Sequence, residues 1–104
     1  MLTVITTGDS RESLERLARE LVERRLAACC QLEGPVTSIY RWQGSVETGE
    51  EYRCFIKTTE HRYAEVERFL LEHHPYDQPQ IVALLSERVE RGYEHWVRES
   101  VEDR

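Results

Sequence analysis

The sequence predicts an α+β fold in which a four-stranded antiparallel sheet carries two helices on one face, with a further helix at the C-terminus. Three observations predict it. Strand-like and amphipathic helical segments follow the order β-α-β-β-α-β, the chain has 104 residues, and no linker-like stretch divides it. A chain of this length can bury one hydrophobic core, so residues 1–104 are expected to form a single domain. This element order is that of the ferredoxin-like α/β plait.

The first two elements are a short strand and an amphipathic helix. Residues 2–6 are rich in β-branched side chains, and Gly8 is expected to end this strand. Asp9 precedes Glu12 by three residues, the spacing of a capping box, which predicts that a helix begins there. Apolar side chains then recur at helical spacing along one stripe: Leu14, Leu17, Ala18, Leu21, Val22 and Leu26.

The middle of the chain predicts two strands. The first covers residues 28–32 and, after an interruption at Gly34–Pro35, residues 36–42. Turns are expected at Gly44 and at Thr48–Gly49. Alternating side chains predict the next strand over residues 52–58.

The last part of the chain predicts a helix, a strand and a terminal helix. The first helix spans about residues 62–73 and should end before Pro75, because proline disfavours helical geometry in the preceding residue. Residues 80–85 form a nearly continuous apolar run, which favours a central strand covered on both faces. After Gly92, a short amphipathic helix is indicated by Trp96, Val97 and Val101.

Composition and charge argue against several classes of partner. The chain has 20 acidic and 14 basic side chains, giving a formal net charge of −6. Phosphate-binding surfaces need clustered Lys and Arg, so we expect neither nucleic acid nor an anionic membrane as a partner. The longest aliphatic run, residues 81–85, is far shorter than the roughly 20 residues that span a bilayer.

Cysteine usage indicates the compartment. Cys29, Cys30 and Cys54 are odd in number and form no Cys-x-x-Cys motif, whereas small secreted domains usually have even, spaced sets. The first residues lack a signal-peptide pattern. We therefore expect a cytoplasmic protein whose cysteines pack as small apolar side chains.

One cluster of residues could carry chemistry. No Gly-rich phosphate loop or nucleophile–base pattern is present, so we expect neither an enzyme nor an organic cofactor. His73 and His74 stand together before Pro75, and imidazole is a common ligand of copper, zinc and nickel. Both are candidate metal ligands, and the alternative is that they cap the helix C-terminus. Neighbouring helical residues diverge by about 100°, so a further ligand would have to come from another element or subunit.

The predicted plait leaves one sheet face bare. Large aromatic side chains, Tyr40, Trp42 and Tyr52, occur on the strands of the long hairpin. Monomers rarely leave such apolar area open to water. The chain is therefore expected to assemble with copies of itself, most simply as a ring.

Five sequence blocks resemble the CutA divalent-cation-tolerance family in order and spacing, and the resemblance covers essentially the whole chain. The blocks are RLAAC at 25–29, TSIYRWQG at 37–44, IKTT at 56–59, HPYDQPQI at 74–81 and YEHW at 93–96.

The resemblance implies a ferredoxin-like subunit in a compact cytoplasmic homotrimer, similar to the PII signalling proteins and linked to tolerance of divalent metals, chiefly copper. Trimer contacts would involve the sheet edges and the hairpin of residues 36–58. Some family members bind copper through a strand-one cysteine and paired histidines, and the histidines correspond to His73 and His74. The cysteine position holds Thr6, a poor ligand for a soft metal, and Gln80 stands where the family commonly has Glu.

The expected function is therefore that of a trimeric protein of the copper-tolerance type, which binds or responds to divalent metal ions. Two alternatives stay open. One is a PII-like sensor of a small anion or nucleotide in clefts between subunits, with Arg41, Lys57 and Arg88 as candidate contacts. The other is a rigid trimeric scaffold that binds a protein partner.

Overall fold

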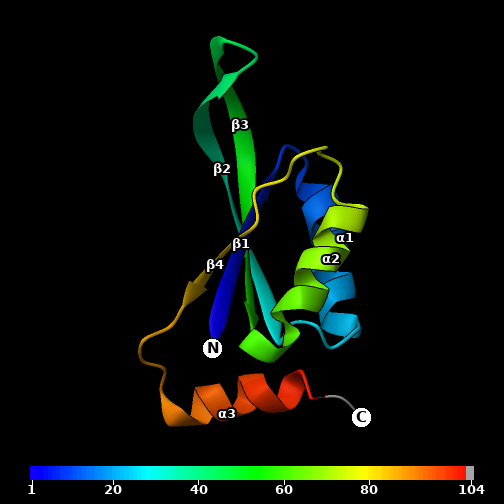
Figure 1. The fold of residues 1–104 in the computed structure, drawn as a ribbon, viewed down its shortest axis with the longest axis vertical. Coiled ribbons are helices and arrows are strands. Elements are labelled where there is room, and N and C mark those ends of the chain that lie inside the picture. The colour runs from blue at the N-terminus through cyan, green and yellow to red at the C-terminus, as the bar shows by residue number, and fades with distance from the viewer. Residues whose placement is uncertain (103–104) are drawn as a thin grey trace.

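The computed structural model describes residues 1–102, and its sheet has the strand order β2-β3-β1-β4 with every neighbouring pair antiparallel (Figure 1). The predicted plait is confirmed. The elements are β1 (Leu2–Gly8), α1 (Arg11–Glu23), β2 (Cys29–Trp42), β3 (Ser45–Thr58), a 3-10 turn (Glu60–Arg62), α2 (Tyr63–His73), β4 (Val82–Leu85) and α3 (Arg91–Ser100).

The core lies between the sheet and the helices α1 and α2, which cover the same sheet face (Figure 1). Side chains of β1 alternate in direction, so Val4 points toward the helices and meets Ile56 of β3 in the ladder. From the helices, Leu14 and Leu21 of α1 and Leu70 of α2 are almost completely buried against these strands. Burial of large aliphatic side chains contributes about 1.5–3 kcal/mol each, so this layer is the main source of stability.

Helix α1 differs from its prediction at both ends. Its N-cap is Ser10 rather than Asp9, because the Ser10 hydroxyl accepts a hydrogen bond from the Ser13 N–H at 3.2 Å. The helix ends at Glu23, and Arg25 adopts a positive φ of 61°. Leu26 thus lies beyond the helix, yet it stays buried because the chain turns back onto the core.

The hairpin of β2 and β3 is longer than predicted and projects beyond the helices (Figure 1). Its two-residue turn is Gln43–Gly44, with φ values of 47° and 82°. The turn expected at Thr48–Gly49 is wrong, because both residues pair with β2 inside the ladder. Cross-strand pairing here outweighs the local turn preference of glycine.

A register shift interrupts the β2–β3 ladder between Glu33 and Val36. Gly34 has a φ of 140°, and a Cβ on it would lie 2.8 Å from Cδ1 of Tyr52, so only glycine fits. An odd insertion of this kind changes which residues of a strand face which side. The even-numbered residues of β2 beyond the shift, including Tyr40, therefore share a face with Glu51.

The position of β4 contradicts the expectation of a central strand. β4 pairs only with β1 and forms the edge of the sheet, while β1 takes the central place. Val82, Leu84 and Leu85 are 44%, 53% and 66% exposed. An apolar run favours coverage on both faces, but within one chain this run belongs to an uncovered edge.

Helix α3 closes the lower end of the sheet (Figure 1). It begins one residue before Gly92, and its N-cap Glu90 accepts hydrogen bonds from the N–H groups of Gly92 and Tyr93 at 2.9 Å. These bonds hold the pKa of Glu90 below its usual value. Val97 is buried in a second small cluster with Ala28 and Val101, against which Met1 packs. No helix within residues 1–102 is long and apolar enough to cross a membrane.

Candidate functional site

The paired histidines lie where α2 gives way to the proline-containing loop. His73 is the last residue of the helix, and His74 has an extended backbone conformation, as expected for a residue before Pro75. This change of conformation sends the two imidazoles to different partners. His73 is exposed, whereas His74 is buried.

The imidazole of His73 is held by its own helix. Its Nδ1 lies 2.9 Å from the carbonyl oxygen of Phe69, and the two rings stack with their centroids 4.3 Å apart. Because a carbonyl oxygen only accepts, Nδ1 carries the proton of this bond, and in the neutral imidazole Nε2 is then the nitrogen with the free lone pair. An imidazole anchored in this way through one N–H is the usual arrangement of a metal-binding histidine.

His74 joins the loop to the sheet through both ring nitrogens. Nε2 donates to the carbonyl oxygen of Thr7 at 2.7 Å, and Nδ1 accepts from the backbone N–H of Tyr76 at 3.0 Å. β4 pairs with β1 only as far as Ile5, so His74 occupies the Thr7 carbonyl beyond the end of that strand. Metal binding by His74 stays a prediction, and it would require the loss of one of these hydrogen bonds.

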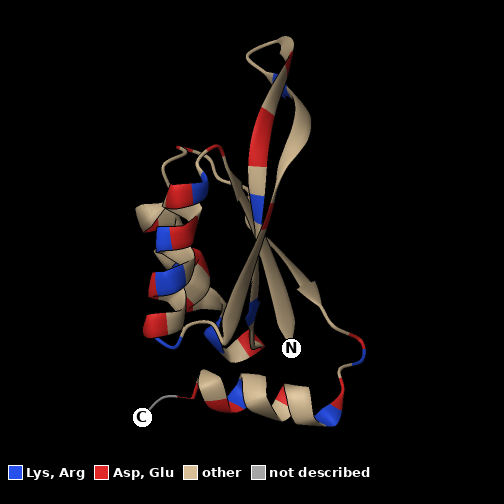
Figure 2. Ribbon diagram, turned by 180° about the vertical axis from the view of Figure 1, so that it is seen from behind, with Lys and Arg blue, Asp and Glu red and all other residues tan. Residues whose placement is uncertain are grey.

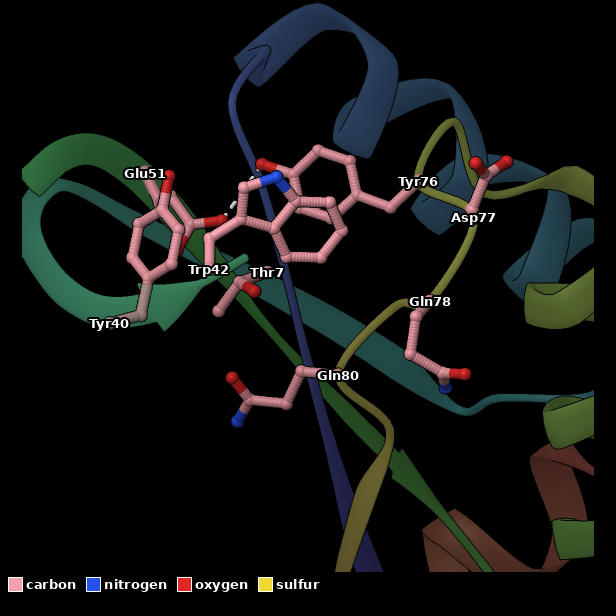
Figure 3. Close-up of a pocket in the computed structure, with 8 residues that line it drawn as sticks. All are labelled: Thr7, Tyr40, Trp42, Glu51, Tyr76, Asp77, Gln78 and Gln80. Atoms are coloured by element: carbon pink, nitrogen blue, oxygen red, sulfur yellow. Dashed lines mark hydrogen bonds between the residues drawn. The ribbon is translucent and has the colours of Figure 1, made fainter. Parts of the chain in front are cut away.

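A cleft of about 460 Å³ lies beside this loop, between β1 and the projecting hairpin (Figure 3). The loop is joined to β3 here, because the hydroxyl of Tyr76 donates a hydrogen bond to Oε2 of Glu51 at 2.8 Å (Figure 3). The residues that line the cleft are Thr7, Tyr40, Trp42, Glu51, Tyr76, Asp77, Gln78 and Gln80.

The cleft is aromatic and acidic. Glu51 and Asp77 supply its charged groups, and Arg41, Lys57 and Arg88 are not among the residues that line it. Burial, followed by the hydrogen bond to Glu51, raises the pKa of Tyr76 well above its usual value. Within one chain, therefore, the cleft is better suited to a neutral or cationic group than to an anion.

Thr6 and two of the cysteines lie on the helix-covered face of the sheet. Thr6 is directly opposite Cys54 in the β1–β3 register, and within residues 1–102 its buried hydroxyl has no hydrogen-bond partner. The interaction between the thiols of Cys30 and Cys54, followed by burial, raises the pKa of Cys30. The same interaction lowers the pKa of Cys54, although burial acts in the opposite direction there. Cys29 faces the other way, and its Sγ lies 3.6 Å from the hydroxyl of Tyr93.

The predicted metal ligands do not form a complete metal site within one chain. Among residues 1–102, no group of three or more His, Cys, Asp or Glu side chains is arranged to hold a metal ion. His73 contributes one available nitrogen, and His74 is engaged on both sides. Gln80 lines the cleft with a neutral amide, so it adds no carboxylate there.

The sequence singled out several cleft residues separately but did not bring them together. Four of them were noted from the sequence, in the hairpin or in the blocks that resemble the family: Tyr40, Trp42, Tyr76 and Gln80. Glu51 was given no role. The signal that could have united them is the Gly34–Pro35 pair, because a register shift there places the aromatic residues of β2 on the face of Glu51.

Comparison with known proteins identifies the family. The family model described as CutA1 divalent ion tolerance protein matches residues 2–100. The chain belongs to the CutA1 family. It is 41% identical over 97 residues to the divalent-cation tolerance protein CutA of Thermus thermophilus, an alignment that covers 93% of this chain and 94% of that protein.

Solved structures of CutA1 proteins have the same fold. The Thermus thermophilus protein superposes with a TM-score of 0.94 at 40% identity and covers 98% of this chain and 100% of its own. A Pyrococcus horikoshii CutA1 variant gives a TM-score of 0.95 at 32% identity over 99% and 100% of the two chains. A third structure, from Archaeoglobus fulgidus, is described as a periplasmic divalent cation tolerance protein and gives a TM-score of 0.94 at 34% identity over 98% and 100%.

Proposed function

We propose that this CutA1 family member is a trimeric, non-enzymatic protein that binds or responds to divalent metal ions, copper foremost. The family membership supports a role in divalent-cation tolerance. The observation that carries the finer proposal is the exposed imidazole of His73, whose Nδ1–H is anchored to the Phe69 carbonyl and whose Nε2 is left to bind a metal.

The ligands that complete this site would come from a neighbouring copy of the chain. Within residues 1–102 of one chain, His73 stands without two further ligands of the usual kinds. His74 would then act mainly as a support, because its hydrogen bonds to Thr7 and Tyr76 fix the path of the chain directly after His73.

Isothermal titration calorimetry with Cu(II) and Zn(II) tests the metal site. We expect His73→Ala to weaken binding by at least tenfold, and His95→Ala, which removes another exposed imidazole on α3, to leave it unchanged. Equal affinities in the wild type and His73→Ala would remove His73 from the site. A wild type that binds neither metal would refute the proposal.

Two surfaces of the chain support assembly into a homotrimer. The edge strand β4 contains no charged residue (Figure 2), although natural proteins commonly protect a free edge with charges. Exposed apolar side chains extend along this edge and the hairpin: Ile39, Tyr40, Trp42, Val46, Val82, Leu84 and Leu85. Both surfaces belong to the sheet edges and the 36–58 hairpin, through which we propose that the copies associate.

Sedimentation analysis of a matched pair of variants tests the assembly. Leu84 on β4 and Leu71 on α2 are 53% and 55% exposed, so each can accept a carboxylate without burying it in the isolated chain. We expect Leu84→Glu to dissociate the trimer and Leu71→Glu to leave it intact. A wild type that sediments as a monomer at micromolar concentration would exclude the trimer.

The state of the cysteines supports a cytoplasmic location. Cys29, Cys30 and Cys54 are free thiols, which is typical of proteins in a reducing compartment. Fractionation of the native cells, with thiol labelling before lysis, tests this part of the proposal. Recovery in the periplasm would refute it.

A second candidate function is a small-molecule sensor of the PII-like kind. The aromatic cleft beside Tyr76 favours it, because ligand sites are typically concave and mostly apolar with a few polar groups. Its carboxylates indicate that an anion would need contacts from outside this cleft, such as Arg41 or Lys57 of another copy. Thermal-shift measurements with nucleotides and with small amines would distinguish the two ligand classes by stabilisation that grows with concentration.

A further inference from the structure

The side chains of Thr6, Cys30 and Cys54 are clustered in the core beneath α1 and α2. In the sheet, Cys54 of β3 lies directly opposite Thr6 of β1 on one side and Leu32 of β2 on the other. Cys30 stands two residues before Leu32 on the same strand, so it points to the same face. The face is the one covered by the helices, because Cys54 belongs to the main core and Cys30 packs against it.

Two features make this cluster more than ordinary packing. Cys30 and Cys54 are diagonal neighbours on adjacent strands, Cys30 packs against the core cluster that contains Cys54, and each thiol shifts the pKa of the other. The hydroxyl of Thr6, a residue that is only 1% exposed, is left without a partner among the described residues. Native proteins seldom leave a buried hydroxyl unpaired, and Thr6 lies directly opposite Cys54, one of the two thiol residues.

We propose that Cys30 and Cys54 form a buried binding site for a single Cu(I) ion, with the Thr6 hydroxyl donating a hydrogen bond to a coordinated sulfur. The proposal extends the metal-binding function proposed above to a second site that does not involve the histidines. Thiolate ligands favour Cu(I) over harder ions, and Cu(I) can be held by two thiolates in a nearly linear arrangement.

The strand register favours a bridging ion over a disulfide. Cys30 is directly opposite Ile56, so Cys30 and Cys54 are diagonal neighbours, whose Cα atoms lie about 7–8 Å apart in a sheet. A disulfide needs a Cα separation below about 7 Å, whereas a sulfur–metal–sulfur bridge spans more. Zinc is disfavoured because its structural sites have four ligands.

The binding step balances without any change of oxidation state. One Cu(I) ion replaces the two thiol protons, which leave to solvent, and the resulting complex has one net negative charge. A buried charge needs a hydrogen-bond donor, and Thr6 supplies one at the position directly opposite Cys54. Cys30 is only partly buried, which gives the ion a path to the site.

Anaerobic titration with Cu(I) against a chromophoric Cu(I) chelator tests the site. We expect the wild type to take one Cu(I) per chain, with a thiolate-to-copper absorption in the ultraviolet, and both Cys30→Val and Cys54→Val to lose it. Cys29→Val is the matched control, since the neighbouring cysteine faces the other side of the sheet, and it should bind normally. Thr6→Val should weaken binding by about tenfold, the effect of one hydrogen bond to a charged group.

Circular dichroism of each variant separates loss of the site from loss of the fold. If a cysteine variant is unfolded, protection of the wild-type thiols from maleimide by Cu(I) supplies the test: mass spectrometry should find Cys30 and Cys54 protected and Cys29 labelled. Normal Cu(I) uptake by folded Cys30→Val and Cys54→Val would overturn the proposal. So would the absence of any Cu(I) uptake by the wild type.

The two metal proposals fail separately. Cu(I) binding that disappears in His73→Ala but persists in the cysteine variants would overturn the thiol site and leave the histidine site standing. Cu(I) binding that persists in His73→Ala, with calorimetry showing no Cu(II) or Zn(II) binding by the wild type, would overturn the histidine site and leave the thiol site standing.

Discussion

Replacement of His74 by leucine should destabilise the protein far more than the same replacement of His73. His74 makes two hydrogen bonds that tie the loop to β1, at 2.7 Å to the Thr7 carbonyl and at 3.0 Å from the Tyr76 N–H. Leucine fills similar space but leaves both partners unpaired. At about 1–2 kcal/mol for each partner stranded in a buried or half-buried position, the expected loss is about 2–4 kcal/mol.

His73→Leu is the matched control. The ring of His73 is exposed, and its one hydrogen bond is to the carbonyl of Phe69 within the same helix. Leucine is also a better helix former than histidine. The expected change is therefore below about 0.5 kcal/mol, the range of most surface substitutions.

Urea denaturation followed by circular dichroism measures both changes. All variants must be compared at one protomer concentration, because association would add to the apparent stability. The reasoning is refuted if His74→Leu lies within about 0.5 kcal/mol of the wild type, or if the two variants lose equal stability. The result also bears on metal tolerance, since a phenotype of a His74 variant would then reflect a weakened fold rather than a lost ligand.

Gly34→Ala should cost about 1–3 kcal/mol, because its Cβ would meet Tyr52 at 2.8 Å and Glu51 O at 3.0 Å at a φ of 140°. Gly49→Ala is the control, because its Cβ would meet only the Tyr40 hydroxyl, at an ordinary contact distance of 3.9 Å; equal melting temperatures of the two variants would contradict the prediction. The carboxylate of Glu90 should titrate by NMR with a pKa below its usual value of about 4.5. Its stabilisation of α3 is therefore complete above pH 4.5 and disappears as the pH falls through the lowered pKa. A titration at the usual pKa would show that the cap does not form. The raised pKa of Tyr76 should keep its phenol protonated in the folded protein beyond pH ~10, where its contribution to stability begins to fall. The pKa values of Tyr63 and Tyr93 are raised as well, so the delayed tyrosinate absorbance should decrease in Tyr76→Phe without vanishing. An unchanged absorbance in that variant would contradict the prediction.

Local sequence patterns predicted most of the helices and strands. The stripe through Leu14, Leu17 and Leu21 identified α1, and all three residues are buried. The proline after His74 correctly marked the end of α2. Such patterns succeed because helical periodicity and proline geometry depend on residues within one or two turns of each other.

Strand placement and strand length were predicted less well. The apolar run that includes Val82 and Leu84 indicated a strand but not its place at the edge, since both central strands and uncovered edges can be apolar. The hairpin continued through Thr48–Gly49 because pairing with Ser38 and Ile39 extends the ladder. Neither outcome can be derived from a single segment, because each depends on which strand lies alongside.

The sequence by itself determined the element order, the main apolar stripes of the core, the family resemblance and the presence of paired histidines and three cysteines. The tertiary structure decided what those side chains can do. It left Nε2 of His73 available, engaged both nitrogens of His74, and brought Cys30 and Cys54 together beneath the helices. The physical reason is that hydrogen-bond partners and cross-strand neighbours are set by strand register, which joins residues distant in sequence.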